Sequence, residues 1–393
     1  MPLVTPPLAL YVHFPWCVSK CPYCDFNSHA LQGELPQDRY IEALERDIAA
    51  QSQVIAGRRL TSIFLGGGTP SLFAPDAIAR VIGVARRCIG WEGSIEVTLE
   101  ANPATIERGR FAEYSAAGVN RVSLGGQSFD VDILKKLGRI HRPADTVLAA
   151  EELHAAGLTN FNIDLMYALP TQEVDGALRD IRQAIALSPA HVSHYQLTIE
   201  HGTLFAAKPP VLPSDDIAAE MLTRCGECLS SAGFAQYEVS AYARTGARSA
   251  HNLNYWHFGD YLGAGAGAHG KLTLSDGAVV RTTRLREPRR YLAARLEEID
   301  QKPVPKAELP FEFMLNALRL PEGFATALFE ERTGLAWTTV RPKVGALRAA
   351  GKLELEGGWC RPTDLGLRFL NDLLVAFLPE KLLPPRLSAL STG

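Results

Sequence analysis

The sequence predicts an α/β protein in which a partial parallel barrel is followed by a smaller C-terminal domain. Up to about residue 242, short apolar runs alternate with longer amphipathic stretches, a pattern typical of βα units that form a parallel sheet. About six such repeats are recognisable, which favours a partial (β/α)6 barrel over a short open sheet. The 393 residues, 47% of them hydrophobic, are sufficient for two domains with buried cores.

The expected strands are short and rich in β-branched and aromatic residues. They span residues 8–14, 60–66, 94–100, 120–126, 160–167, 191–200 and 236–243. Between them, residues 37–51, 75–88 and 176–187 carry apolar side chains at helical spacing and are long enough to cross back over a sheet. Because parallel sheets bind ligands where their strands end, the loops after these strands are the expected site.

Changes in composition predict the domain boundaries. Residues 1–270 are expected to form the barrel domain, residues 271–306 a linker with charges and prolines, and residues 307–393 the C-terminal domain. This last part reads as helices, a hairpin with a Gly-Gly turn and a final helix, which suits a winged-helix-like α+β domain. These elements are expected at residues 310–320, 324–334, 338–351, 352–362 and 364–378.

Charge and cysteine content limit the possible functions. The net charge is −3 with an isoelectric point near 6.4, and Lys and Arg are scattered, so nucleic-acid binding is not expected. The first residues lack the pattern of a secretory leader and no later segment has the ~20 apolar residues of a membrane helix, which predicts a cytoplasmic protein. Seven cysteines in such a chain indicate metal or redox chemistry, not disulfides.

Three of these cysteines, Cys17, Cys21 and Cys24, lie within eight positions just after the first expected strand. Thiolates are the usual ligands of iron–sulfur clusters, and three protein ligands leave one iron of a cubane open. An open metal position is typical of ligand binding or chemistry. One alternative is a zinc site with His29 as the fourth ligand. The other is that the three thiols bind no metal and have only a structural role. Zinc sites usually have two separated cysteine pairs, so the cluster is favoured.

Other candidate ligand-binding residues follow the later strands. Gly67, Gly68 and Thr69 in "LGGGTPS" would let the backbone approach a ligand closely, although such a loop can also be only a tight turn. A single polar residue at a strand end is usually a cap or a solvated side chain. Several at one mouth favour a ligand site. The polar residues in such positions are Glu100, Gln127, Arg139 and Asp164.

The C-x3-C-x2-C spacing in a βα context, with an aromatic residue before the last Cys, resembles the radical S-adenosylmethionine superfamily. The resemblance implies a 4Fe–4S cluster held by the three cysteines, with its open iron chelated by the amino and carboxylate groups of S-adenosylmethionine (SAM). The strand-end motifs, with Tyr11, are similar over nearly the whole chain to the branch related to oxygen-independent coproporphyrinogen III oxidase. In that branch, the residues that surround SAM match Tyr11, Tyr23, Gly67, Gly68, Thr69, Glu100, Gln127, Arg139 and Asp164.

Two departures separate this chain from the oxidases. The oxidases carry a further Cys where this chain has Phe26, and they have a long N-terminal arm that is missing here. The segment "HNLNYW" is similar instead to haem chaperones of the same branch, which implies haem as cargo and no coproporphyrinogen oxidase activity. Oxidative decarboxylation of coproporphyrinogen is the alternative. The implied haem-binding residues are His251, Asn252, Tyr255 and Trp256.

From the residues alone, the alternative to a haem-binding role for His251 is a structural one in a packed core turn. His257 and His269 are other candidate ligands of the haem iron. The resemblance also implies a homodimer, peripheral membrane contact and transfer of haem to apoproteins of the respiratory chain. A tRNA-modifying radical enzyme would require a basic surface, which the isoelectric point argues against. The G-x-G-x-x-G pattern at 265–270 lies outside a βαβ unit and is expected as a turn, and Cys225 and Cys228 are expected to be structural.

Overall fold

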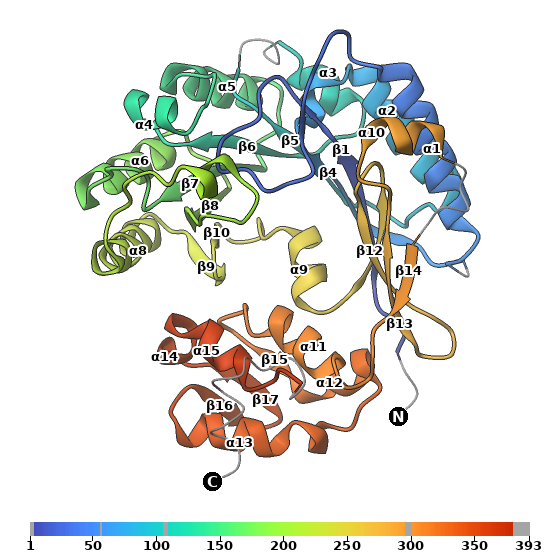
Figure 1. Ribbon diagram of the computed structural model, residues 1–393, viewed down its shortest axis with the longest axis vertical. Coiled ribbons are helices and arrows are strands. Elements are labelled where there is room, and N and C mark those ends of the chain that lie inside the picture. The colour runs from blue at the N-terminus through green and yellow to red at the C-terminus, as the bar shows by residue number, and fades with distance from the viewer. Residues whose placement is uncertain (1–3, 56, 105–108, 295–299, 380–393) are drawn as a thin grey trace.

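The computed structural model describes residues 4–55, 57–104, 109–294 and 300–379 (Figure 1). Its main feature is a twelve-stranded sheet in the order β14-β13-β12-β11-β1-β4-β5-β6-β7-β8-β10-β9. The two outermost strands are not paired with each other, so the sheet forms an incomplete barrel. The predicted α/β class and partial barrel are therefore confirmed.

Seven neighbouring strands in this sheet run parallel, and six of them are predicted βα strands. Their side chains are buried on both faces, as the near-continuous apolar runs of the sequence require. The seven strands are β1 (Leu8–Phe14), β4 (Leu60–Gly67), β5 (Glu96–Ala101), β6 (Arg121–Gln127), β7 (Phe161–Tyr167), β8 (His191–Gln196) and β11 (Asp260–Ala264).

Helices that follow the parallel strands form an arc around the outside of the sheet (Figure 1). Local capping fixes several of their ends: the side chain of Asp130 accepts the N–H groups of Asp132 and Ile133, and Ser214 accepts that of Ile217. These helices are α1 (Gln37–Ser52), η1 (Pro70–Leu72), α2 (Pro75–Cys88), α3 (Phe111–Ala116), α4 (Val131–Lys136), α5 (Pro143–Ala155), α6 (Val174–Ala186), α7 (Leu204–Ala207) and α8 (Asp215–Ser231).

The two edges of the sheet differ from the sequence-based expectation. The single strand expected at residues 236–243 is an antiparallel hairpin, β9 (Ala235–Glu238) and β10 (Ala241–Ala243). Residues 271–306 were expected as a linker, but the described parts, 271–294 and 300–306, extend the sheet with antiparallel strands, because buried Leu272, Val279 and Val280 give this charged segment an apolar face. The added elements are β12 (His269–Thr273), β13 (Val279–Thr283), α10 (Pro288–Ala293) and β14 (Asp300–Pro303).

The C-terminal part has its own core around Phe313, Phe324 and Phe329. Gly357 and Gly358, at φ +56° and +80°, form the predicted hairpin turn, while the last predicted helix is broken at Phe369. Strands β15 (Phe324–Ala325), β17 (Trp359–Pro362) and β16 (Leu353–Glu356) form its sheet. Its helices are α11 (Leu309–Ala317), α12 (Thr326–Thr333), η2 (Trp337–Thr339), α13 (Arg341–Ala349), α14 (Asp364–Arg368) and α15 (Leu370–Val375).

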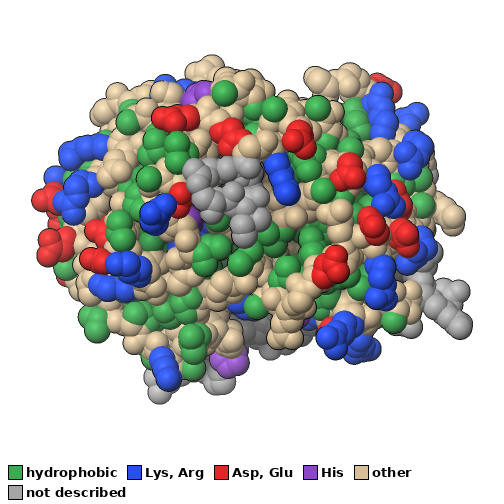
Figure 2. All heavy atoms as spheres, turned by 90° about the horizontal axis from the view of Figure 1, so that it is seen from above, with side chains coloured by type: hydrophobic (Ala, Val, Ile, Leu, Met, Phe, Trp, Pro, Cys, Tyr) green, Lys and Arg blue, Asp and Glu red, His purple; other side chains and the backbone are tan. Residues whose placement is uncertain are grey.

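Helix α9 (Ala250–Trp256) lies between the barrel and the C-terminal part (Figure 1). Just beyond it, the ring of Phe258 contacts that of Phe313 edge-on, with 5.7 Å between centroids. The view from above shows Lys and Arg interspersed with Asp and Glu over the described part of that face (Figure 2). Within the described ranges, every helix is too short or too polar to span a bilayer.

Candidate functional site

The three clustered cysteines lie on the loop that follows β1. The loop is closed at its base by the parallel pairing of β2 (Trp16–Cys17) with β3 (His29–Ala30). The Nζ of Lys20 donates to the carbonyl oxygens of Phe26 and Ser28, at 3.3 and 3.0 Å. Backbone and lysine contacts therefore shape the loop, and all three thiols are free and partly exposed.

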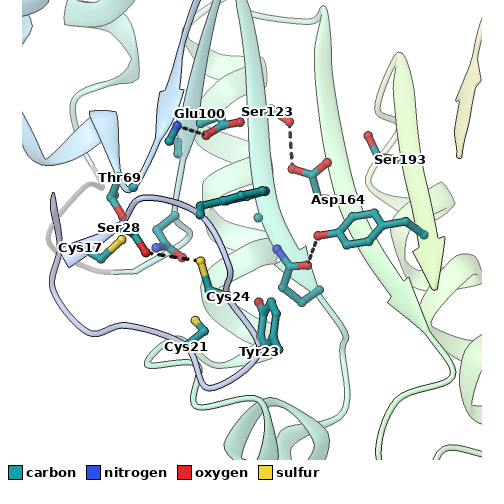
Figure 3. Close-up of a pocket in the computed structure, with 18 of the residues that line it drawn as sticks. Cys17, Cys21, Tyr23, Cys24, Ser28, Thr69, Glu100, Ser123, Asp164 and Ser193 are labelled. Carbon is teal, nitrogen blue, oxygen red and sulfur yellow. Dashed lines mark hydrogen bonds between the residues drawn. The ribbon is translucent and has the colours of Figure 1, made fainter. Parts of the chain in front are cut away.

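The three cysteines line a cavity of about 420 Å³ at the carboxyl ends of the parallel strands. The sulfur atoms gather on one side of this cysteine cavity, and the side chains of Glu100 and Asp164 reach it from the strands (Figure 3). Of the nine residues predicted to surround SAM, eight line it. These are Tyr23, Gly67, Gly68, Thr69, Glu100, Gln127, Arg139 and Asp164.

The glycine-rich loop packs directly on the backbone of the cysteine loop. The N–H of Gly68 donates to the carbonyl oxygen of Phe14 at 2.6 Å, and that of Thr69 to the carbonyl oxygen of Trp16 at 2.8 Å. A Cβ atom on Gly68 would lie 2.6 Å from the Trp16 oxygen, and Gly67 adopts φ +113°. Glycine is therefore required at Gly68 because a side chain would separate the two loops, and at Gly67 because of its φ and because an added Cβ would meet the His13 ring.

Glu100 and Asp164 present carboxylates to the cysteine cavity. Glu100 accepts the Gly67 N–H at 2.9 Å, while burial and the nearby Asp164 raise its pKa to about 7. Burial also raises the pKa of Asp164, against the hydrogen bonds from Ser123 at 2.9 Å and Asn162 at 2.8 Å. Partly desolvated carboxylates of this kind are suited to accept hydrogen bonds from hydroxyl or ammonium groups of a ligand.

The donor set fits an iron–sulfur cluster. Burial raises the pKa of the Cys17 thiol to about 11, but coordination to a metal deprotonates a thiol outright. Nη1 of Arg139 lies 3.7 Å from Cys21 Sγ, where its positive charge would offset the negative charge of thiolates. Among the described residues, no three His, Cys, Asp or Glu side chains are arranged around a single ion. A cubane requires a different geometry, since each thiolate binds a separate iron.

His29, the fourth ligand in the zinc alternative, does not line the cysteine cavity. It lies on β3, and its Nε2 is buried without a hydrogen-bond partner in the described part of the chain. The structure therefore brings the three cysteines together at one cavity without this imidazole.

A second cavity, also of about 420 Å³, adjoins the first and shares Phe26, Gly67 and Glu100 with it. We call it the aromatic cavity, because Tyr11, Phe26, Tyr255 and Tyr261 line it together with His13, Asp25, Asn27, Gly67, Glu100, Gly267, His269 and Arg286. Tyr11, the ninth residue predicted to surround SAM, is therefore placed here, where its hydroxyl hydrogen-bonds His13 Nδ1 at 2.9 Å.

The Asn27 amide attaches the cysteine loop to the rim of the aromatic cavity. Its Nδ2 donates to the carbonyl oxygen of Ala266 at 2.9 Å and to that of Arg286 at 2.8 Å. The predicted turn at residues 265–270 is the connection between β11 and β12, and it lies against this amide. Two segments distant in sequence are thus fixed to the cysteine loop by one side chain.

The four residues predicted to bind haem are on α9 and have different environments. His251 is buried, with Nδ1 3.0 Å from Ser62 Oγ, Nε2 3.0 Å from the Tyr255 hydroxyl, and its ring stacked on Phe64. Burial lowers its pKa to about 3. Asn252 lines the cysteine cavity and Tyr255 the aromatic cavity. Trp256 lines neither, and the Arg319 guanidinium lies 4.4 Å from its ring centroid.

Comparison with known proteins places the chain in a family. The radical SAM superfamily model matches residues 11–184, and the HemN C-terminal domain model matches residues 304–369. Heme chaperone HemW of Escherichia coli is 48% identical, covering 95% of this chain and 99% of its own length. The chain belongs to the HemW family.

Other relatives extend this HemW comparison. Heme chaperone HemW of Haemophilus influenzae is 47% identical over 96% of this chain and 99% of its own length. A Bos taurus protein, radical S-adenosyl methionine domain-containing protein 1, mitochondrial, is 36% identical over 94% of this chain and 87% of its own length. The solved structure of E. coli coproporphyrinogen III oxidase HemN shares the fold, with a TM-score of 0.80 at 21% identity over 95% of this chain and 90% of its own.

Sequence reasoning missed several residues that line the cysteine cavity. Ser123, Ser193, Glu238 and Ser240 also line the cysteine cavity. The sheet register pairs Ser123 with Glu100 and Ser193 with Asp164, and Ser123 Oγ donates to Asp164 at 2.9 Å, so these four side chains form one polar patch across four strands. Polar residues at alternate positions of otherwise apolar strands were the available signal, because such positions point to the same side of a sheet.

Proposed function

We propose that this chain is a haem chaperone that carries a 4Fe–4S cluster on Cys17, Cys21 and Cys24, binds SAM at the open iron, and passes haem to haem-requiring apoproteins. The relatives named heme chaperone HemW support the haem function. The observation that carries the proposal is the continuity of the cysteine cavity with an aromatic cavity through Phe26, Gly67 and Glu100. That arrangement provides adjoining space for a small polar cofactor and a flat apolar ligand.

The residues of the cysteine cavity have separate parts in this proposal. The cluster would supply a Lewis-acidic iron that chelates the methionine end of SAM. The backbone of Gly67, Gly68 and Thr69 would lie against that ligand, and Glu100 and Asp164 would accept hydrogen bonds from its hydroxyl and amino groups. Arg139, 3.7 Å from Cys21 Sγ, would offset the negative charge of the thiolates. Tyr23 and Gln127 would close the remaining walls.

The haem surface is assigned to the segment His251–Trp256. Asn252 and Tyr255 line the cavities directly, and His251 holds the Tyr255 hydroxyl at 3.0 Å. In this conformation the His251 ring would contribute to haem binding by positioning Tyr255. The hydrogen bond between His251 Nε2 and the Tyr255 hydroxyl would have to break before Nε2 could bind iron. Trp256 would support the helix through its contact with Arg319.

Homodimer formation, peripheral membrane contact and recipients in the respiratory chain stay predictions from the family resemblance. The cytoplasmic location stays a prediction as well. Size-exclusion chromatography with light scattering and flotation with vesicles would measure the first two. The interspersed charges on the face seen in Figure 2 support the expectation that nucleic acid is not a partner.

The decisive experiment is anaerobic reconstitution followed by titration with haem and then with an apo-cytochrome. The proposal predicts stoichiometric haem uptake, bound iron and inorganic sulfide, and transfer of haem to the apoprotein. The same preparation, incubated with SAM and coproporphyrinogen III, is expected to give no decarboxylated product. Absence of haem uptake would refute the chaperone function, and formation of protoporphyrinogen would establish the oxidase alternative.

A further inference from the structure

The aromatic cavity contains two histidines, and only one of them has a ring nitrogen available to a ligand. His13 is buried, and both of its nitrogens are engaged: Nδ1 with the Tyr11 hydroxyl at 2.9 Å and Nε2 with the Asn27 carbonyl oxygen at 3.0 Å. His269, at the start of β12, is exposed. Its Nδ1 lies 3.4 Å from Thr283 Oγ1, and its Nε2 has no hydrogen-bond partner in the described ranges.

The surroundings of His269 favour a neutral imidazole with one free lone pair. Partial burial and the positive charges of Arg281 and Arg286 lower its pKa. A neutral ring that donates from Nδ1 to Thr283 leaves Nε2 as a base, which is the form in which histidine binds a metal. The exposed position requires no rearrangement of the core before a ligand can reach this nitrogen.

The remaining walls of the aromatic cavity suit a large flat ligand. Phe26 is 62% exposed on the rim that the two cavities share, so its ring is accessible to an apolar ligand. Tyr255 and Tyr261 meet edge-on with 4.5 Å between ring centroids. A macrocycle at this site would cover these apolar surfaces.

One cationic side chain in the lining is free to pair with an acid. Arg286 is exposed, and its guanidinium forms no ion pair with any described residue. The other charged groups on the lining, Asp25 and Glu100, are acidic. A ligand with carboxylates would therefore turn them toward Arg286, whose planar guanidinium matches carboxylate geometry.

We propose that the aromatic cavity is the haem site, that His269 Nε2 supplies an axial ligand to the haem iron, and that Arg286 pairs with a propionate. This inference rests on the proposed haem function and adds an iron ligand outside the segment His251–Trp256. Coordination donates the Nε2 lone pair to iron and displaces a solvent ligand. It breaks no bond of the protein and changes no oxidation state.

The first test compares His269→Ala with His154→Ala, which removes an exposed histidine on the outer helix α5. Titration with haem should show at least ~10-fold weaker binding for H269A and none for H154A, because an axial bond is worth more than an outer-shell contact. Iron-free protoporphyrin should bind equally to wild type and both variants. His269→Met should recover binding with a shifted haem absorption spectrum, because the thioether also ligates haem iron.

The second test addresses the carboxylate contact. Arg286→Gln should weaken haem binding about 2- to 5-fold, as expected for an exposed ion pair, and should leave binding of the haem dimethyl ester unchanged. A variant that weakens both ligands equally would show that Arg286 does not pair with a propionate.

The outcomes separate this inference from the chaperone proposal. If wild-type protein takes up no haem, the proposed function fails. If wild type takes up haem but H269A matches it in affinity and absorption spectrum, the proposed function survives and the assignment of His269 is overturned.

Discussion

The backbone N–H of Gly67 and Oε2 of Glu100 are 2.9 Å apart, in a hydrogen bond that joins the glycine-rich loop to the end of the next strand. The two residues come from separate βα units, and both line the two cavities. The contact orients the carboxylate, yet one backbone hydrogen bond does not compensate for removing a charge from water.

The ionised Glu100 carboxylate should therefore lower the free energy of unfolding of the cofactor-free protein. Its pKa is about 7 in the folded chain against 4.5 ordinarily, so the contribution of Glu100 to stability is most favourable at low pH and falls as the pH rises from 4.5 through 7. Glu100→Gln should be more stable than wild type above pH 7, by at most about 3 kcal/mol. Urea unfolding at pH 4.5 and 8 measures this difference, which should vanish at the lower pH. An equal difference at both values would contradict the assigned cause.

Loss of a single cysteine in the loop should remove the cluster. Cys17→Ser, Cys21→Ser and Cys24→Ser each leave two thiolates for four irons, which is too few to hold a cubane. Iron and acid-labile sulfide per chain should fall to background after anaerobic reconstitution. Cys88→Ser, at an exposed position on α2, is the matched control and should keep both. Retention of sulfide in the three loop variants would refute the ligand assignment.

A methyl group on Gly68 should disturb the same loop from the opposite side. The added Cβ would lie 2.6 and 2.7 Å from the backbone oxygens of Trp16 and Phe14, so Gly68→Ala should cost about 1–3 kcal/mol and lower iron content. Gly83→Ala is the control: it is inside α2, and its Cβ would meet only the end of the flexible Arg87 side chain. That variant should gain about 0.5–1 kcal/mol. Thermal unfolding with iron analysis distinguishes the two.

The buried imidazole of His251 should contribute to stability whether or not haem is present. His251→Ala removes hydrogen bonds to Ser62 and Tyr255 and a stacked ring, which predicts a loss of about 2–4 kcal/mol in unfolding free energy. His257→Ala, at the half-buried end of the same helix, should cost less than about 1 kcal/mol. Urea unfolding of apoprotein is the measurement, and equal losses would argue against a packing role for His251.

The sequence was sufficient for the parallel core and the position of the cysteine cavity, because both depend on local patterns. Strand β1 and helix α2 occupy the predicted residues, and the strand ends bring together Glu100, Gln127 and Asp164. The antiparallel edge formed by β12, β13 and β14 was not recognised, because charges and prolines in this part of the sequence obscured the alternation at Leu272 and Val280. Which residues of α9 face a cavity was also beyond sequence reasoning, since it depends on how the helix packs against β4.

The Asn27 amide couples the two cavities mechanically. Its two hydrogen bonds, to the carbonyl oxygens of Ala266 and Arg286, hold the cysteine loop against the wall beside His269. A displacement of the cysteine loop would therefore be passed through this one amide to the far wall of the neighbouring cavity.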